Sequence, residues 1–220
     1  MKPVRPILLV HGILGQRHLY WNVFAARLRA DGFQVAEATL PYSMLGDIRK
    51  AAATLRDKVE ASCAEWGVPQ VDLVCHSAGG LVARYMLKFV VRPPWNRVGH
   101  LVLLGTPHHG TYFSYVMPLA RIAAQARPGS DLLRELNEGN HPAVRTTNLW
   151  SPVDGIVIPA THSKLDASHV TNVRVEWMHH WGFLVSPGVY HKVREALLAD
   201  AVPMKRPEKA PRRAPRGSAA

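Results

Sequence analysis

The residues best suited to chemistry in this chain surround a serine at the end of an apolar run. Residues 71 to 80 read Val-Asp-Leu-Val-Cys-His-Ser-Ala-Gly-Gly. A serine hydroxyl attacks a carbonyl efficiently when a base takes its proton, its surroundings leave it accessible, and donors hold the oxyanion that forms. A sharp turn from a strand into a helix exposes such a serine, and the small residues Ala78, Gly79 and Gly80 permit that turn. The segment therefore predicts Ser77 as a nucleophile, with a Ser/Gly helix cap as the alternative.

The two cysteines predict no special chemistry. Cys63 lies in a helical pattern, and Cys75 stands where the common G-x-S-x-G pattern has its first glycine. That position requires a small side chain, and a thiol meets the requirement. Since no CxxC pair or metal-ligand spacing is present, we expect two buried thiols, no disulfide and no metal.

The composition predicts one folded domain followed by a tail. The chain has 220 residues, 47% of them hydrophobic, which is enough for one sizeable core. We expect the domain at residues 1–204 and disorder at 205–220, where six basic residues and three prolines accompany no large apolar side chain. The tail carries +5 of the formal charge of +11 (six bases minus Glu208). We expect it to be solvated, without a nucleic-acid partner; contact with anionic lipid or nucleic acid is the alternative.

The sequence shows no targeting or membrane-spanning segment. The apolar run at 7–10 is too short for the core of a signal peptide, and no window approaches the roughly 18 apolar residues of a membrane span. The expectation for the chain as given is a cytoplasmic protein, and secretion stays open if a signal is missing from its start.

Apolar runs of strand length alternate with helical patterns along the chain. This alternation predicts an α/β domain with a mostly parallel central sheet. Strands are expected at 7–10, 33–40, 71–75, 100–105, 146–150 and 170–177, and helices at 18–30, 48–66, 78–89, 131–137 and 187–199. Within residues 112–139, the stretch up to 126 is apolar with few charges. This cover segment, residues 112–139, is expected either to cover a substrate cleft or to be an ordinary packing pair.

The base should be a histidine that follows a late strand. Catalytic residues of a parallel sheet lie in loops at the carboxyl ends of its strands, so a histidine within an element, such as His100 or His191, is a weaker candidate. Of the 12 histidines, His180 follows the expected strand at 170–177 and precedes the last helix. We choose His180 as the base, with its neighbour His179 as the alternative.

The acid should follow the preceding strand. Asp154 stands directly after the strand at 146–150, in a Ser-Pro-Val-Asp-Gly turn. Asp166 and Asp131 are less well placed, and Asp-Gly is itself a turn signal. The order of Ser77, then Asp154, then His180 is the one expected for the α/β-hydrolase arrangement, which favours Asp154.

Two backbone amides should hold the oxyanion. One normally follows the nucleophile, so we expect the N–H of Ala78. The other should come from the loop after an early strand, where the chain reads His11-Gly12-Ile13-Leu14-Gly15. The glycines leave the backbone free to turn an amide inward, and we choose that of Ile13.

Taken together, these segments resemble a bacterial lipase or esterase of the α/β-hydrolase superfamily, similar to the small triacylglycerol lipases. The resemblance extends from Ile7 to about Ala199. It rests on the segments His11-Gly12-Ile13, His76-Ser77-Ala78-Gly79-Gly80 and Gly105-Thr106-Pro107-His108-His109-Gly110, with Asp154 and His180. It implies a three-layer α/β-hydrolase fold with helices on both faces of the sheet. It also implies that Ser77, His180 and Asp154 are catalytic, that the amides of Ile13 and Ala78 form the oxyanion hole, and that His11, Gly12, His76 and Gly79 support them.

The resemblance further implies an ester or lipid substrate, no cofactor, transient contact with lipid surfaces and a monomer. The Gly-Thr-Pro-His-His-Gly segment resembles a structural turn beside such sites, so His108 and His109 are not expected to be catalytic. Alternatives remain open at this point. The same triad serves thioesterases, amidases and acyltransferases, and a binding protein can keep the fold without turnover.

Overall fold

A six-stranded parallel sheet forms the centre of the protein. The computed structural model describes residues 5–13, 15, 21–41, 45–117, 120–139 and 143–199. The strand order is β2-β1-β3-β4-β5-β6, and all five neighbouring pairs are parallel. The strands are β1 (Ile7–Val10), β2 (Val35–Ala38), β3 (Val71–His76), β4 (Val98–Leu104), β5 (Arg145–Trp150) and β6 (Val170–Arg174). The expected parallel α/β architecture is confirmed, while the expected tail at 205–220 lies outside the described residues.

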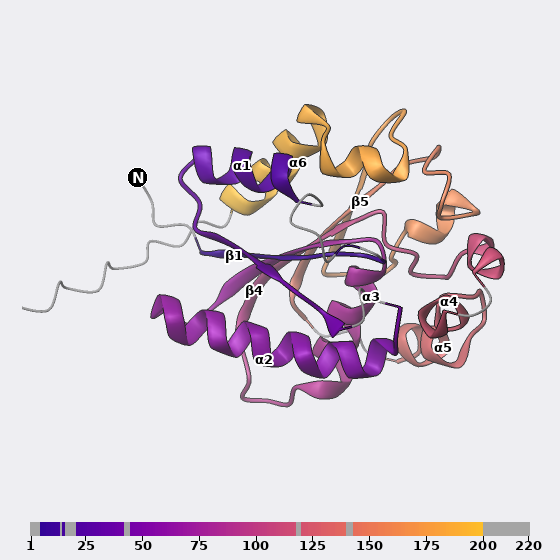
Figure 1. Ribbon diagram of the computed structural model, residues 1–220, viewed down its shortest axis with the longest axis horizontal. Helices are drawn as coiled ribbons and strands as arrows, with labels where there is room; N and C mark the ends of the chain where they lie inside the picture. Colours follow the sequence, from indigo (N-terminus) through magenta and orange to yellow (C-terminus); the bar gives the residue numbers. More distant parts are fainter. Residues whose placement is uncertain are drawn as a thin grey trace, which may run out of the picture.

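Helices cover both faces of this sheet and give three layers. In Figure 1, α1 (Asn22–Ala30) and α6 (Pro187–Leu198) lie on one face, and α2 (Ile48–Trp66) and α3 (Ala78–Tyr85) lie on the other. The alternation of side chains along β1 divides the core accordingly. Leu8 and Val10 pack on the side of α2 and α3, and Ile7 and Leu9 pack on the side of α1 and α6.

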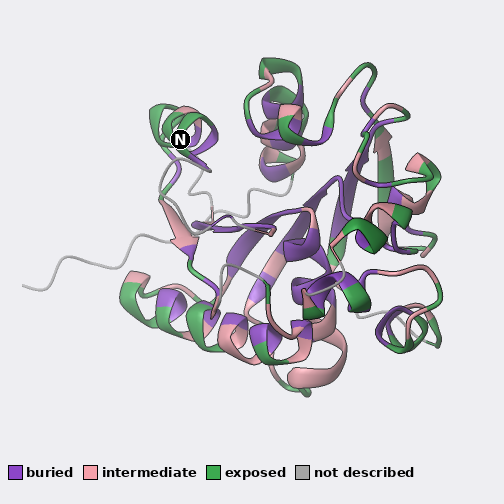
Figure 2. Ribbon diagram, turned by 45° about the vertical axis from the view of Figure 1, so that its right-hand side comes forward, coloured by how far each residue is buried: buried purple, intermediate pink, exposed green. Residues whose placement is uncertain are grey.

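The central strands are largely buried because both of their faces are covered. Every residue of β1 and β3 is buried, whereas most of the edge strands β2 and β6 is not. Figure 2 shows this gradient, with buried residues concentrated in the middle of the sheet.

Local signals set the ends of α2 where the sequence predicts them. Asp47 caps its first turn, since the carboxylate accepts a hydrogen bond from the Arg49 N–H at 2.8 Å. Gly67 ends it in the left-handed conformation, with φ of 62°.

Some predicted elements are shorter in the structure. The strand expected at 33–40 is paired only over Val35–Ala38. The prediction was too long because Phe33 and Leu40 are buried outside the paired strand and extend the apolar pattern of the sequence. The strand expected to run to 177 ends at Arg174, where a turn with positive φ at Trp177 follows. The helix expected from 18 begins at Asn22, and residues 16–20 lie outside the described part.

The helix after the serine also differs from its prediction. It is α-helical over Ala78–Tyr85 and then widens into a π-helix, η2 (Met86–Val90). The π-helix ends at Val90, one residue beyond the predicted end, and the Pro93-Pro94 pair that follows cannot continue a helix.

The described part of the cover segment contains three short helices. They are η3 (Tyr112–Val116), α4 (Arg121–Gln125) and α5 (Asp131–Asn137), and residues 118–119 between the first two are outside the described part. Two further short helices, η4 (Ala160–Ser163) and η5 (His180–Leu184), lie in the loops after β5 and β6. In the described ranges, no helix combines the length and hydropathy needed to cross a bilayer.

Candidate active site

Ser77 lies on a strained turn between β3 and α3. Its φ is 56° and its ψ is −129°, a backbone conformation that residues other than glycine rarely adopt. The turn is held from the neighbouring strand, because the Ser77 N–H donates to the carbonyl of Leu104 at 2.9 Å. The sharp strand-to-helix turn predicted at this serine is therefore present.

Small residues after the serine let α3 start close to the sheet. A Cβ at Gly79 would lie 2.6 Å from the carbonyl oxygen of His11 and 2.8 Å from that of Val10. A Cβ at Gly80 would overlap the side chain of Thr106. Cys75, by contrast, is a buried core residue, and burial raises the pKa of its thiol.

His180 and Asp154 form a buried pair. The His180 Nδ1 lies 2.9 Å from both carboxylate oxygens of Asp154, and both side chains are almost completely buried. The main chain joins them as well, since the His180 N–H donates to the Asp154 carbonyl at 2.8 Å. The carboxylate in turn accepts from the N–H groups of Ile156 and Val157, at 3.0 and 2.8 Å. A proton on Nδ1 satisfies the carboxylate and leaves Nε2 as an acceptor.

The alternative candidates lie elsewhere. His179 is exposed and precedes η5, whereas Asp166 is exposed in the loop after η4. Asp131 pairs with Arg134 on the outer side of α5. Among these candidates it is His180 and Asp154 that the structure brings into contact.

Ser77 and His180 border the same cavity. It has a volume of about 270 Å³, and its lining is largely apolar, with Phe113, Met117 and Trp181 among the contributing side chains. Ile13 and Ala78 line it too. Within the described residues no acceptor is found for the backbone N–H of either one. The two residues predicted to supply the oxyanion hole thus border the same cavity as the serine.

The loop before Ile13 is braced by His11. Its Nε2 accepts from the Leu40 N–H at 3.1 Å, so the proton is on Nδ1, which lies 2.8 Å from the Gly12 carbonyl oxygen. Burial lowers the pKa of His11 and keeps this ring neutral, although the bond to Gly12 acts in the other direction. The ring therefore ties the loop after β1 to the end of β2.

Gly105 has a role in the site that sequence reasoning missed. It follows β4, has φ of +55°, and a Cβ there would lie 2.9 Å from the Asp154 Oδ2. A glycine at a strand end is the only signal the sequence offers for this close approach. His76 was expected as a supporting residue, but its contact with His180 was not foreseen, with the ring centroids 4.6 Å apart.

The segment after Gly105 is a structural turn, as its sequence suggests. His108 is fully buried and lies between Arg84 and Asn148, with its Nδ1 3.2 Å from the Arg84 Nη1 and its Nε2 3.1 Å from the Asn148 Oδ1. His109 is exposed. Neither histidine lines the cavity beside Ser77.

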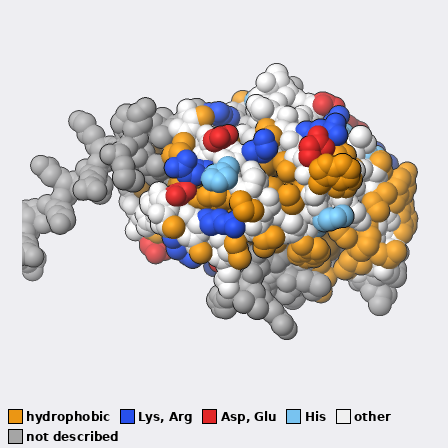
Figure 3. Space-filling model, turned by 90° about the horizontal axis from the view of Figure 1, so that it is seen from above, with side chains coloured by type: hydrophobic (Ala, Val, Ile, Leu, Met, Phe, Trp, Pro, Cys, Tyr) orange, Lys and Arg blue, Asp and Glu red, His pale blue; other side chains and the backbone are white. Residues whose placement is uncertain are grey.

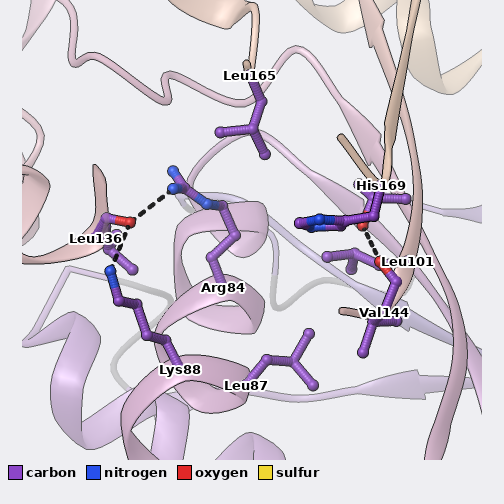
Figure 4. A pocket seen from close by; sticks show the side chains of 9 residues that line it. Arg84, Leu87, Lys88, Leu101, Leu136, Val144, Leu165 and His169 are labelled. Atoms are coloured by element: carbon purple, nitrogen blue, oxygen red, sulfur yellow. Dashed lines mark hydrogen bonds between the residues drawn. The ribbon is translucent and has the colours of Figure 1, made fainter. Parts of the chain in front are cut away.

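A second cavity near this network is too small for an ester. Its volume is about 20 Å³, that of a water-sized space. Figure 4 shows Arg84 and Lys88 on one side of it, both directed at the carbonyl oxygen of Leu136, at 3.0 and 3.3 Å. Both cationic side chains thus donate hydrogen bonds to backbone carbonyl oxygen atoms.

Residues 5–135 match the protein family described as alpha/beta hydrolase fold. The chain belongs to this alpha/beta hydrolase family. The match includes the strained serine turn and the loop after β1, and the expected resemblance to bacterial lipases also finds support. Over 115 residues, the chain is 31% identical to triacylglycerol lipases of Pseudarthrobacter phenanthrenivorans and of Burkholderia plantarii.

These lipase alignments cover part of each protein. They span 50% of this alpha/beta hydrolase chain and 35% and 31% of the two lipases, so the chain covers about a third of their length. Among solved structures, Aspergillus fumigatus lipase B superimposes with a TM-score of 0.76 at 20% identity, covering 89% of this chain and 52% of that one. Mature Bacillus licheniformis lipase BlEst2 gives 0.74 at 20% identity, over 88% and 92%. These two likenesses concern the fold.

Proposed function

We propose that this alpha/beta hydrolase cleaves carboxylic esters, with Ser77 as nucleophile, His180 as base and Asp154 as its orienting partner. One observation carries the proposal: the imidazole bound to Asp154 and the serine on the strained turn border a single apolar cavity. The printed activity of the two similar proteins, triacylglycerol lipase, supports the same reaction class.

The proposed reaction is acyl transfer in two halves. His180 takes the proton of Ser77 as the hydroxyl attacks the ester carbonyl, and the amides of Ile13 and Ala78 hold the oxyanion. His180 then protonates the departing alcohol and leaves an acyl group on the serine. Water, deprotonated by the same histidine, releases the acid and restores the enzyme. One oxyanion donor is typically worth about 3 kcal/mol, so these two backbone amides matter as much as the side chains.

The surroundings of the cavity favour an apolar acyl group. Its lining is mostly apolar, and large hydrophobic side chains are exposed on the same segments: Tyr112, Tyr115, Val116 and Trp181 are each more than half exposed. In Figure 3, hydrophobic side chains gather toward the right-hand side, where Figure 1 draws the segments between β4 and β5. We therefore propose a lipid-like ester as substrate and transient contact with lipid surfaces.

The decisive variant is Ser77→Ala. We expect it to lose at least a thousandfold in kcat on nitrophenyl esters and all labelling by a fluorophosphonate probe, because both reactions require the hydroxyl. Ser62→Ala is the matched control, since Ser62 is a buried serine in α2 away from the cavity. If Ser77→Ala kept the activity and labelling of the parent, the proposal would be wrong.

A substrate panel tests the acyl group. Esters from acetyl to palmitoyl, with matched thioesters and amides, should be compared below and above the concentration at which they aggregate. We expect medium or long acyl esters to give the highest kcat/KM. Preference for acetyl esters, or for thioesters at every length, would contradict the proposed substrate class.

A further inference from the structure

His76 has a contact that the proposed reaction does not use. It is the last residue of β3, directly before Ser77, and its side chain is fully buried. Its Nε2 lies 3.0 Å from the main-chain carbonyl oxygen of His180, and the two rings are 4.6 Å apart. The strand that carries the candidate nucleophile thus contacts the segment that carries the candidate base.

The chemistry of the contact sets the state of the His76 ring. A carbonyl oxygen only accepts hydrogen bonds, so Nε2 carries a proton and donates it. Burial and the nearby His180 ring lower the pKa of His76 well below its usual value, and the ring is therefore neutral. Aromatic side chains surround it: the rings of Trp21, Trp181 and Phe183 have centroids 6.0 to 6.5 Å away. His76 is therefore a neutral hydrogen-bond donor in a buried, largely apolar environment, where a hydrogen bond is stronger than it is in water.

This bond completes the restraint of His180. On one side, the loop of Asp154 holds both the imidazole and the main-chain N–H of His180. On the other side, His76 holds its carbonyl. Because His76 and Ser77 are consecutive residues, the bond ties the base to the same piece of backbone that carries the nucleophile.

We propose that His76 is a positioning residue, whose Nε2–H holds the main chain of His180 so that the imidazole keeps its place at the cavity that Ser77 also borders. The inference rests on the proposed function. Acyl transfer is sensitive to misplacement of the base by about 1 Å. Loss of the bond should therefore lower kcat more than it changes KM, since His76 does not line the cavity.

Substitutions at position 76 separate the donor from the bulk of the side chain. His76→Phe keeps an aromatic ring and removes the donor, and we expect kcat to fall at least tenfold with KM within about twofold. His76→Gln offers an amide N–H near the place of Nε2, and it should restore most of that loss. His100→Phe is the matched control, because His100 is a fully buried histidine of the neighbouring strand, away from the cavity.

A folded His76→Phe protein with the kcat of the parent would overturn the proposal, as would equal losses in the Phe and Gln variants. Should the Phe variant not fold, His76→Asn provides the same test, since its amide is too short to reach the carbonyl; parental kcat there would also overturn it. Loss of activity in Ser77→Ala with full activity in these variants would leave the ester-hydrolase proposal standing. Full activity in Ser77→Ala would defeat the function itself.

Discussion

At the scale of single residues, the candidate site depends on one glycine as much as on its polar side chains. Gly105 lies against the Asp154 carboxylate, where a Cβ would be 2.9 Å from Oδ2 and 3.4 Å from the His180 Nδ1. Its φ of +55° adds strain for any other residue. A methyl group there would displace the acid from the base that it orients.

We expect Gly105→Ala to lower kcat/KM at least tenfold. Gly67→Ala is a close control, because Gly67 has φ of +62° with nothing within 4 Å of the added methyl. Both variants should lose about 1 kcal/mol of stability from backbone strain, but only the first should lose activity. Ester hydrolysis kinetics measure the loss of activity, and urea unfolding measures the loss of stability. Equal activity in the two variants would contradict a role for this close approach.

At the scale of elements, the cover segment is fastened to the body at α5. Arg84 of α3 donates to the carbonyl of Leu136 and to the Asn137 side chain, at 3.0 and 2.9 Å. Lys88 of η2 donates to the carbonyl of Glu135 at 2.8 Å. Burial lowers the pKa of Arg84 to about 10, which leaves it charged at neutral pH. Cations at the last carbonyls of a helix are favourable, so α5 is anchored at its carboxyl end.

The anchoring predicts that Arg84→Met loosens α5. The substitution removes the donor to the Asn137 side chain and the shorter of the two hydrogen bonds to the Leu136 carbonyl, and we expect a loss of about 2 kcal/mol in stability. Amide hydrogen exchange across Asp131–Asn137 should become at least tenfold faster. Arg134→Met, which changes an exposed arginine of α5 itself, should have little effect. Unchanged exchange in Arg84→Met would show that apolar packing alone holds the helix.

At the scale of the whole molecule, the amino end of the sheet couples stability to pH. Burial, reinforced by Arg145 and Arg5, lowers the pKa of His100 to about 4 from 6.5. Below pH 6.5 the unfolded chain binds a proton that the folded chain refuses until about pH 4, so the fold loses stability as pH falls across this window. Burial raises the pKa of Asp72 to about 6 from 3.8 despite the Arg5 partner, so this group lowers stability as pH rises from 3.8 to 6. The two effects oppose each other.

Replacing His100 should leave the opposite effect of Asp72 on the pH dependence of stability without its counterpart. As pH falls from 7 to 4, we expect the free energy of unfolding of His100→Asn to increase relative to that of the parent, by up to roughly 3 kcal/mol. Urea unfolding at several pH values measures the difference between the two proteins. His191→Asn, which changes an exposed histidine of α6, is the control. Parallel stability curves for the His100 variant and the parent would contradict the prediction.

The boundaries of elements were predictable where a local signal ends them. α2 begins and ends as expected because Asp47 and Gly67 act on neighbouring residues. β2 was predicted too long, since Phe33 and Leu40 are buried outside its ladder and hydropathy reports burial rather than pairing. The sequence made His100 a weaker candidate for the base, but it gave no sign that the His100 Nδ1 is buried without a hydrogen-bond partner in the described part of the chain.

The sequence by itself determined the parallel α/β fold, the serine turn and the order in which the candidate triad follows it. These features are local, because apolar runs, small residues and turn residues act within a few positions of one another. Only the tertiary structure decided which of two adjacent histidines meets Asp154, why Gly105 must be small, and that His76 holds the backbone of His180. Each of these contacts joins loops at the ends of different strands. Their distances depend on how the strands stand side by side, which no short stretch of sequence encodes.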